Sequence, residues 1–219
     1  MKRITLIICI LFSLTSCEIQ YDGETKIAVT GKIIDQNGNP IPNKNVDITI
    51  YSDDMYTPSD LISFGQSDQN GNFTLIFPAP KGEYDFSISI NNLVNQTSEF
   101  QAKEISAKKN NFENYKLDLN DITLYKKESI TTLKLILNKT STNKHLKDIE
   151  IEGKQPNNYI DLNPLQNNSD YLNTNYFLIK NQTIILKYTI IDYSNAATPT
   201  LHSISIPIIN DAVTYTITY

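Results

Sequence analysis

The sequence predicts an all-β protein made of two consecutive antiparallel β-sandwich domains. The first observation behind this prediction is a short alternation of apolar and polar residues that recurs along the chain, as in KIAVTGKII, FTLIF and TIILKYTIID. Alternation with a period of two is typical of half-buried strands. The second is composition, because Asn, Thr, Ile and Ser are abundant, which suits strands joined by polar turns. No run keeps helical spacing over a useful length.

Bulk composition indicates a folded globular protein with one large domain or two of ordinary size. The chain has 219 residues, of which 40% are hydrophobic and 20% are charged. Its formal net charge is -5, and Arg3 is the only arginine. A surface that binds nucleic acid needs clustered Lys and Arg to neutralise phosphates. We therefore expect no nucleic-acid partner.

The N-terminus has the layout of a secretory signal. Lys2 and Arg3 precede an apolar run over residues 4–14, and small residues lead to Cys17. The run is too short to span a bilayer, which takes about 20 residues. The end, Leu-Thr-Ser-Cys, resembles the lipobox of bacterial lipoproteins. That resemblance implies a signal peptide over residues 1–16, cleavage before Cys17 and acylation of this cysteine; the alternative is an ordinary signal peptide with a chance cysteine.

The predicted cleavage decides how the mature chain is held. Cys9 lies in the removed segment, so Cys17 remains as a lipidated cysteine and no disulfide forms. Residues 17–25 form a polar, lipidated tether. The acyl anchor is then the attachment to the membrane, since several acyl chains together hold firmly. We expect a protein of the cell envelope at the outer membrane, on its periplasmic or its surface face.

The pentapeptide DQNGN occurs twice, from Asp35 and from Asp68. A calcium-binding EF-hand loop has glycine at its sixth position and glutamate at its twelfth, and neither copy meets these requirements. Asn-Gly beside alternating apolar residues is instead a strong turn signal, because both residues tolerate positive φ. We therefore predict two β-turns rather than two repeat units, with Gly38 and Gly71 at positive φ.

Residues 27–126 resemble the carboxypeptidase regulatory-like domain, a transthyretin-like β-sandwich. The resemblance lies in three motifs, from VTGKIIDQNGNPIPNKNVDITI through SDQNGNF to YDFSI. The matching positions are Gly31, Asp35, Gly38, Pro40, Ile41, Val46, Asp68, Gly71, Phe73, Tyr84, Phe86 and Ile88. It implies an accessory module without catalytic residues. We place this domain at 26–126.

Residues 127–219 start a second pattern. The runs ITTLKLIL, DIEIE, YFLIK, LHSISIPII and VTYTITY are short, apolar and separated by turn residues. They predict a second antiparallel sandwich, immunoglobulin-like in size, of no recognised family. A single large β-structure is the alternative.

Few residues suggest chemistry. His145 falls in a polar turn, and His202 opens a strand, so we interpret both as solvated or strand-edge residues. No metalloprotease, serine-hydrolase or Cys-His motif is present. We therefore expect no enzyme and no cofactor. Asp53, Asp54 and Asp60 are weak candidates to coordinate a hard cation; the alternative is a hydrated loop.

The long polar segment from Gln155 to Tyr176 carries the candidate contact residues Tyr159, Tyr171 and Tyr176. Tyrosine among Asn and Ser is typical of adaptable recognition surfaces, and exposed rings also stack on sugars. The alternative is a connection whose tyrosines cap the edge of the sandwich.

Three functions remain open. The leading hypothesis is a lipid-anchored, non-enzymatic binding or assembly accessory at the outer membrane, associated with a transporter or nutrient uptake, with an envelope protein or a glycan as partner. The alternative is a structural adhesin or pilus-like surface protein. The third is an unrecognised hydrolase, which needs a cleft holding paired carboxylates.

Overall fold

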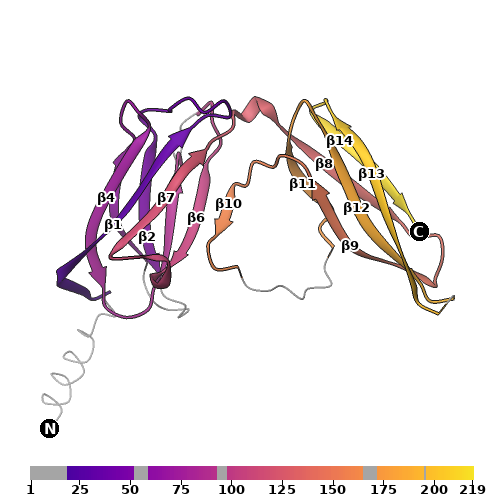
Figure 1. The fold of residues 1–219 in the computed structure, drawn as a ribbon, viewed down its shortest axis with the longest axis horizontal. Coiled ribbons are helices and arrows are strands. Elements are labelled where there is room, and N and C mark those ends of the chain that lie inside the picture. Colours follow the sequence, from indigo (N-terminus) through magenta and orange to yellow (C-terminus); the bar gives the residue numbers. More distant parts are fainter. Residues whose placement is uncertain (1–18, 52–58, 93–97, 165–171, 195) are drawn as a thin grey trace, which may run out of the picture. The chain divides into compact units, whose positions relative to one another are not determined.

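The computed structural model describes residues 19–51, 59–92, 98–164, 172–194 and 196–219. Strands dominate these residues, and the predicted all-β class is confirmed (Figure 1). The described residues form two compact units. The first comprises residues 19–51, 59–92, Ala102–Thr123 and Tyr159–Asn163, and the second comprises the remainder. The predicted signal peptide, including Cys17, lies outside the described residues.

The first unit holds two sheets. One has the order β4-β1-β7, formed by β4 (Asn72–Pro80), β1 (Tyr21–Ile34) and β7 (Lys116–Thr123). The other has the order β10-β6-β5-β2-β3, formed by β10 (Tyr159–Asp161), β6 (Lys103–Lys108), β5 (Asp85–Ile90), β2 (Asn45–Tyr51) and β3 (Asp60–Gln66). A short 3-10 turn, η1 (Lys109–Asn111), follows β6.

Alternating sequence builds the core of the first unit. In β2, Val46, Ile48 and Ile50 are fully buried while the residues between them are partly exposed. Phe73, Leu75 and Phe77 repeat this pattern in β4. The largest fully buried side chains of this unit also include Ile33, Phe86, Ile88 and Ile90. Burial of such side chains is the main stabilising contribution in a protein of this kind.

The two pentapeptides fold into loops of the same design. In the first, the Asp35 carboxylate accepts the backbone N–H of Asn37 at 2.8 Å and of Asn39 at 2.9 Å. In the second, Asp68 accepts the equivalent N–H groups of Asn70 and Asn72, both at 2.8 Å. Such Asx turns explain why the aspartate is present at both places. The predicted β-turns are confirmed.

The glycines of these loops have the predicted backbone conformation. Gly38 has a φ of 85° and Gly71 a φ of 78°. The preceding Asn37 and Asn70 do not have positive φ, contrary to the expectation for an Asn-Gly hairpin turn. Each loop is therefore a turn closed by a left-handed glycine, with the glycine N–H donating to the aspartate carbonyl oxygen.

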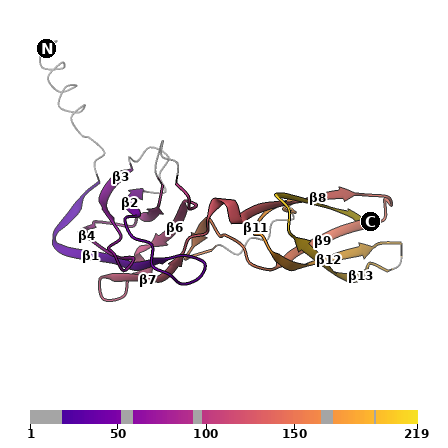
Figure 2. The ribbon, with the colours of Figure 1, turned by 90° about the horizontal axis from the view of Figure 1, so that it is seen from above.

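The second unit is also a two-layered β-structure. One sheet has the order β11-β8-β14, from β11 (Asn175–Ile179), β8 (Ile130–Asn138) and β14 (Ala212–Thr218). The other has the order β13-β12-β9, from β13 (Thr198–Ile208), β12 (Gln182–Asp192) and β9 (Lys144–Glu152), and Figure 2 shows the two layers apart. The 3-10 turn η2 (Lys127–Ser129) precedes β8. The buried core of the second unit consists of Leu133, Leu135, Ile151, Leu178, Ile184, Leu186, Tyr188, Ile206, Ile208 and Ile217.

Three of the strand pairings are parallel, which differs from the purely antiparallel sheets that we predicted. They are β1 with β7, β6 with β10, and β8 with β14. Alternation along one strand sets which face is buried, but it carries no information on the direction of the neighbouring strand. The direction therefore could not be read from the sequence.

The short strand β10 joins the first unit although the chain on both sides of it belongs to the second. Tyr159, Ile160 and Asp161 pair with Glu104, Ile105 and Ser106 of β6. Leu162 N–H donates to Ser106 O at 3.0 Å, and the Asn163 amide donates to Asn111. The units divide the chain between Thr123 and Leu124, except that β10 belongs to the first unit and residues 98–101 belong to the second. Because β1 begins at Tyr21, residues 21–25 lie in a strand and not in the tether that we predicted over 17–25.

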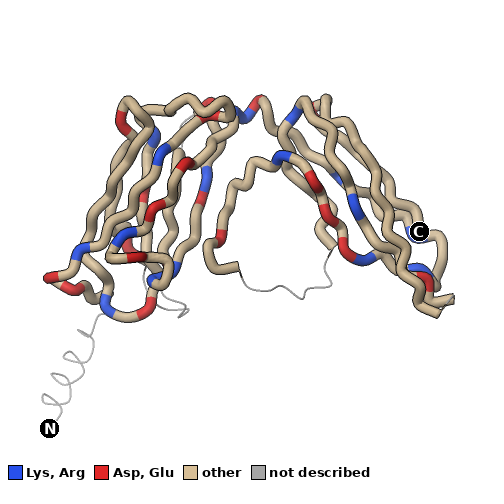
Figure 3. Tube along the Cα trace, viewed as in Figure 1, with Lys and Arg blue, Asp and Glu red and all other residues tan. Residues whose placement is uncertain are grey.

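Charges are interspersed over both units. Acidic and basic residues are mixed along the described chain, and no basic stripe is present among them (Figure 3). Ion pairs such as Lys116–Asp118 at 3.1 Å lie at the surface, where each contributes little to stability. In the described part of the chain, no helix has the length and apolar character needed to cross a membrane.

Candidate functional site

A cavity of about 720 Å³ opens at one end of the first unit. It lies between the beginning of β1, the end of β4, the beginning of β5 and the segment from η1 to β7. This volume is in the usual range of sites for small molecules, roughly 300–1,000 Å³. Thirteen residues line it: Asp22, Thr25, Ile27, Ala79, Pro80, Lys81, Gly82, Tyr84, Phe86, Lys109, Phe112, Asn114 and Tyr115.

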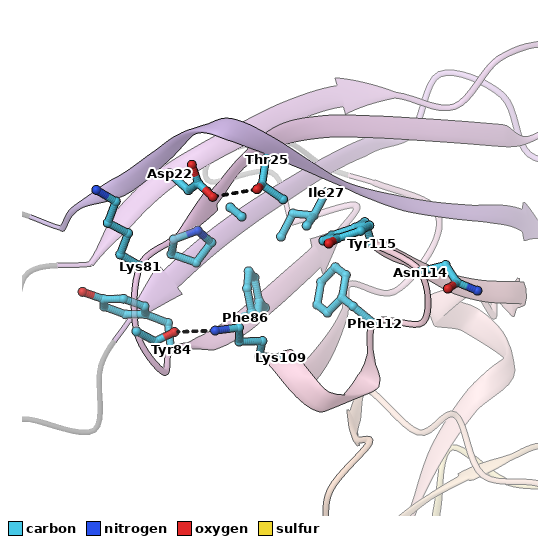
Figure 4. A pocket seen from close by; sticks show the side chains of 13 residues that line it. Asp22, Thr25, Ile27, Lys81, Tyr84, Phe86, Lys109, Phe112, Asn114 and Tyr115 are labelled. Atoms are coloured by element: carbon cyan, nitrogen blue, oxygen red, sulfur yellow. Dashed lines mark hydrogen bonds between the residues drawn. The ribbon is translucent and has the colours of Figure 1, made fainter.

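Aromatic rings line much of the cavity. Phe86 points inward from β5 and is buried, and its ring centroid lies 5.0 Å from that of Phe112, with the planes tilted by 52°. Figure 4 shows Tyr115 beside Phe112 and Ile27, and Tyr84 at the opposite end with Lys81. Tilted pairs at this distance are favourable and hold each other in place. The contact with Phe86 therefore holds the Phe112 ring in place before a ligand arrives.

Tyr115 is held in an uncommon backbone conformation. Glu113 and Lys116 exchange two backbone hydrogen bonds of 2.9 Å, which closes a two-residue hairpin turn. Asn114 and Tyr115 at the centre of this turn have φ values of 49° and 66°. Positive φ is uncommon and costly for a bulky side chain. The turn nonetheless presents the Tyr115 ring, which is 66% exposed, at the mouth of the cavity.

The polar groups at the rim are already oriented by neighbours. The Asp22 carboxylate accepts the Thr25 hydroxyl at 2.6 Å and the Glu24 N–H at 3.0 Å. The hydrogen bond from Thr25 first, and that from Glu24 next, hold the pKa of Asp22 below its ordinary value. Asp22 is therefore an ionised hydrogen-bond acceptor at neutral pH. Opposite it, Lys109 donates to Gly82 O at 3.4 Å (Figure 4).

The tyrosines predicted as contact residues are not part of this cavity. Tyr159 lies in β10 of the first unit and is 57% exposed. Tyr176 lies in β11 of the second unit, where it is partly buried against the core and donates to Asn173 O at 2.9 Å. Tyr171 lies outside the described residues. The structure thus places the two described tyrosines in strands of different units, rather than on one loop.

The three aspartates predicted as weak cation ligands, Asp53, Asp54 and Asp60, are not seen together in the described structure. Asp60 begins β3 and accepts a hydrogen bond from the Tyr21 hydroxyl. Burial first, and this hydrogen bond next, raise the pKa of Tyr21. Asp53 and Asp54 lie outside the described residues. Over the ranges that the structure describes, no group of three or more His, Cys, Asp or Glu side chains could hold a metal ion.

Both histidines lie inside strands of the second unit. His145 is in β9, not in a turn as expected, and its ring meets Tyr193 edge-on at 5.1 Å. His202 is in β13 and stacks on Tyr188 at 4.9 Å with planes 11° apart. These ring contacts are packing interactions between neighbouring residues of the sheet surface and edge.

The cavity could not be predicted from the sequence because its lining residues come from three separate segments, 22–27, 79–86 and 109–115. Tyr84 and Phe86 were singled out as part of a strand motif, and Phe112 and Tyr115 were not singled out. The hairpin turn at residues 113–116 has no Asn-Gly or Asp-Gly pair, which is the usual sequence signal for this type of turn. Asn at the first central position was the one available signal, since Asn tolerates the left-handed region.

No family model matches the chain, and no curated protein matches it. Among solved structures, it is similar to a shaft pilin, spaA, from Lactobacillus rhamnosus GG, at 9% identity and a TM-score of 0.36, over 89% of this chain and 98% of that chain. It is similar to the tip fimbrial protein Mfa3 from Porphyromonas gingivalis, at 9% identity and a TM-score of 0.27, over 83% and 82%.

A third similar structure is a 9R-lipoxygenase from Cyanothece PCC8801, at 20% identity and a TM-score of 0.30. The match covers 54% of this chain, which spans only 20% of the lipoxygenase chain. All three TM-scores are below 0.5, so we base no functional argument on them. The resemblance of residues 27–126 to the carboxypeptidase regulatory-like domain stays a prediction.

Proposed function

We propose that this chain is a lipid-anchored, non-enzymatic adhesive protein of the cell surface, which binds its ligand in the cavity at the end of the first unit. The cavity is the observation that carries the proposal. It combines aromatic rings with a few polar groups that neighbours hold in place, which is the composition of a binding site. Cys17, acylated as the lipobox resemblance implies, attaches the protein to the membrane.

The state of Asp22 favours binding over catalysis. A general acid or base works best when its pKa lies near the operating pH, which for a carboxylate requires a raised pKa. The hydrogen bonds from Thr25 and Glu24 lower the pKa of Asp22 instead. An ionised carboxylate fixed by two donors suits the recognition of hydroxyl or N–H groups.

Strand order gives each unit a parallel ladder that is loaded in shear when the chain is pulled from end to end. The chain enters the first unit through β1 and leaves it for the second through β7, and these strands are parallel neighbours over Ala28↔Lys116 to Ile34↔Thr123. In the second unit β8 and β14 are parallel over Ala212↔Thr132 to Thr218↔Asn138. Tension between the start of one strand and the end of its parallel neighbour loads all the hydrogen bonds of the ladder together. Such units resist unfolding when pulled along the chain.

The direct test is retention of cells under flow. Cells that express the full chain pass over a surface carrying an array of glycans and peptides, and the shear stress is raised in steps. We expect wild-type cells to stay attached to a subset of spots and Cys17→Ala cells to detach. Tyr115→Asn cells should detach as well, because Asn keeps the turn while the ring is lost.

Phe64→Ala is the matched control for this experiment. Phe64 is in the same unit and is 74% exposed, but it does not line the cavity. We expect Phe64→Ala cells to stay attached like the wild type. Equal retention of cells that lack the protein would overturn the proposal, as would recovery of the bound ligand in a cleaved form, which would indicate a hydrolase.

A further inference from the structure

The lining carries two lysines and one carboxylate, and Glu83 beside it brings the local charge to zero. Lys109 lies 3.8 Å from Glu83, and Lys81 is near enough to Asp22 to contribute to the low pKa of that carboxyl group. Each lysine of the lining therefore has an acidic neighbour. A site that selects an anion or a cation normally carries an excess of the opposite charge. This rim gives no such preference and suits a ligand without net charge.

The aromatic side chains of the lining favour a ligand that is itself a ring with an apolar face. Phe112 and Tyr115 lie at one end of the cavity and Tyr84 at the other, so the ligand meets aromatic surface at both ends (Figure 4). Phe86 is only 1% exposed and supports the Phe112 ring from the core. The C–H groups on one face of a pyranose pack against such surface. A volume of about 720 Å³ accommodates a short oligosaccharide rather than a single small metabolite.

The polar groups exclude a purely aromatic or aliphatic ligand. The Asp22 carboxylate is an acceptor with lone pairs left beyond those that Thr25 and Glu24 use. The Asn114 amide both donates and accepts, and the Lys81 ammonium donates. An apolar ligand covering these groups would leave them without partners, at a cost of about 1–3 kcal/mol for each buried group. Hydroxyl groups, which donate and accept, satisfy all three.

The length of the tether limits where this ligand is bound. Asp22 is five residues after Cys17, and a fully extended chain spans at most about 18 Å over five residues. If Cys17 is acylated, as the proposed function states, the cavity stays within that distance of the lipid headgroups. A ligand carried on the same membrane is then always within reach.

We infer that the cavity binds a neutral saccharide. This inference rests on the proposed function and adds the chemical class of the ligand. The sugar rings stack on Phe112 and Tyr115, and their hydroxyl groups bond to Asp22, Lys81 and Asn114. Two sources share this chemistry, namely the headgroup of a neutral glycolipid and a free glycan.

Two binding experiments with the full-length Cys17→Ala chain test the inference, because this variant has no acyl anchor to obscure the result. In the first, an array carries neutral hexose oligosaccharides beside their uronic-acid and amino-sugar counterparts. We expect binding to neutral spots and at least about tenfold weaker binding to both charged series. Tyr115→Asn should weaken binding to the neutral spots about tenfold, since one stacked ring is lost. Phe64→Ala should leave it unchanged.

The second experiment separates the two sources. Phosphatidylcholine vesicles with and without a galactosyl glycerolipid are sedimented with the protein. Sedimentation with the galactolipid vesicles alone, lost in Tyr115→Asn, identifies a headgroup ligand. Array binding without sedimentation identifies a free glycan. Either result supports the inference.

Failure of the inference can be told apart from failure of the proposed function. Stronger binding to uronic-acid or amino-sugar spots would overturn the neutral class. Absence of all saccharide binding, while cells still attach to peptide spots in a Tyr115-dependent way, would overturn the saccharide and leave the adhesive function standing. If Tyr115→Asn changed neither saccharide binding on the array nor attachment of cells under flow, the cavity would not be the binding site. Both proposals would then be wrong.

Discussion

Gly71 packs against Ile33, whereas Gly38, at the same place of an identical pentapeptide, packs against nothing. A Cβ atom added to Gly71 would lie 2.4 Å from the carbonyl oxygen of Ile33. One added to Gly38 would meet no atom within 4 Å. Both residues have positive φ. The two loops therefore separate the cost of backbone conformation from the cost of a steric contact.

Gly38→Ala and Gly71→Ala should differ in their effect on the stability of the first unit. Gly38→Ala costs only the left-handed conformation of a residue with a Cβ atom, about 1 kcal/mol. Gly71→Ala adds a contact with backbone that cannot move without disturbing β1, and we expect a loss of at least about 3 kcal/mol. Urea denaturation should show both losses as lower midpoints with unchanged slopes.

Asparagine at the same positions provides the control. Gly38→Asn should lie close to wild type, because Asn tolerates positive φ. Gly71→Asn should remain strongly destabilised, because its Cβ atom meets the same oxygen. Equal losses at both positions would show that the close approach to Ile33 does not decide stability.

Tyr176 and Tyr159 should respond differently to truncation. Tyr176 packs on the core of the second unit, so Tyr176→Ala should lower the stability of that unit by about 1–3 kcal/mol. Tyr159 is exposed, and Tyr159→Ala should stay within about 0.5 kcal/mol of wild type. Thermal unfolding followed by circular dichroism measures both. Tyr176→Phe, which keeps the ring, should recover most of the loss; if it does not, the hydrogen bond to Asn173 rather than the ring holds this strand.

Cys17→Ala should release the protein from the membrane fraction. The predicted acyl chains on Cys17 provide the attachment, and the tether is polar. Metabolic labelling with an alkyne fatty acid, followed by fractionation, measures the loss. Cys9→Ala is the control, because Cys9 lies in the predicted signal peptide and its loss should leave labelling intact. Labelled Cys17→Ala protein would disprove the lipobox prediction.

Pulling direction should decide the mechanical strength of the first unit. With handles at the N-terminus and at Lys127→Cys, force shears the parallel ladder between β1 and β7. With handles at the N-terminus and at Lys81→Cys, force separates antiparallel β1 and β4 at the Tyr21↔Pro80 end, so their hydrogen bonds break one after another. Single-molecule force spectroscopy should record a higher unfolding force in the first geometry. Similar forces in both would show that the direction of the strand pairing does not set the unfolding force.

The sequence was sufficient wherever structure depends on neighbouring residues. Alternation located the buried faces of β1 and β4, and DQNGN located two left-handed glycines. It was insufficient wherever structure depends on distant residues. No local pattern in residues 114–116 predicts that they contact β1. The cavity lining comes from three distant segments, so it has no linear pattern either. The pairing of Tyr159–Asp161 with β6 joins residues of different halves of the chain, so the three-residue strand has no local signal either.

The strand β10 is synthesised after all the other strands of the first unit, which affects how this unit folds during synthesis. A growing polypeptide emerges from its N-terminus, and early domains generally fold first. The strands β1 to β7 are complete once Thr123 has emerged, but the edge of β6 stays open until Tyr159–Asp161 follow, after β8 and β9. An open edge is a template for pairing with other chains. During synthesis the first unit therefore passes through an interval in which it is folded but one strand edge is unpaired, and chaperones that cover strand edges would act in that interval.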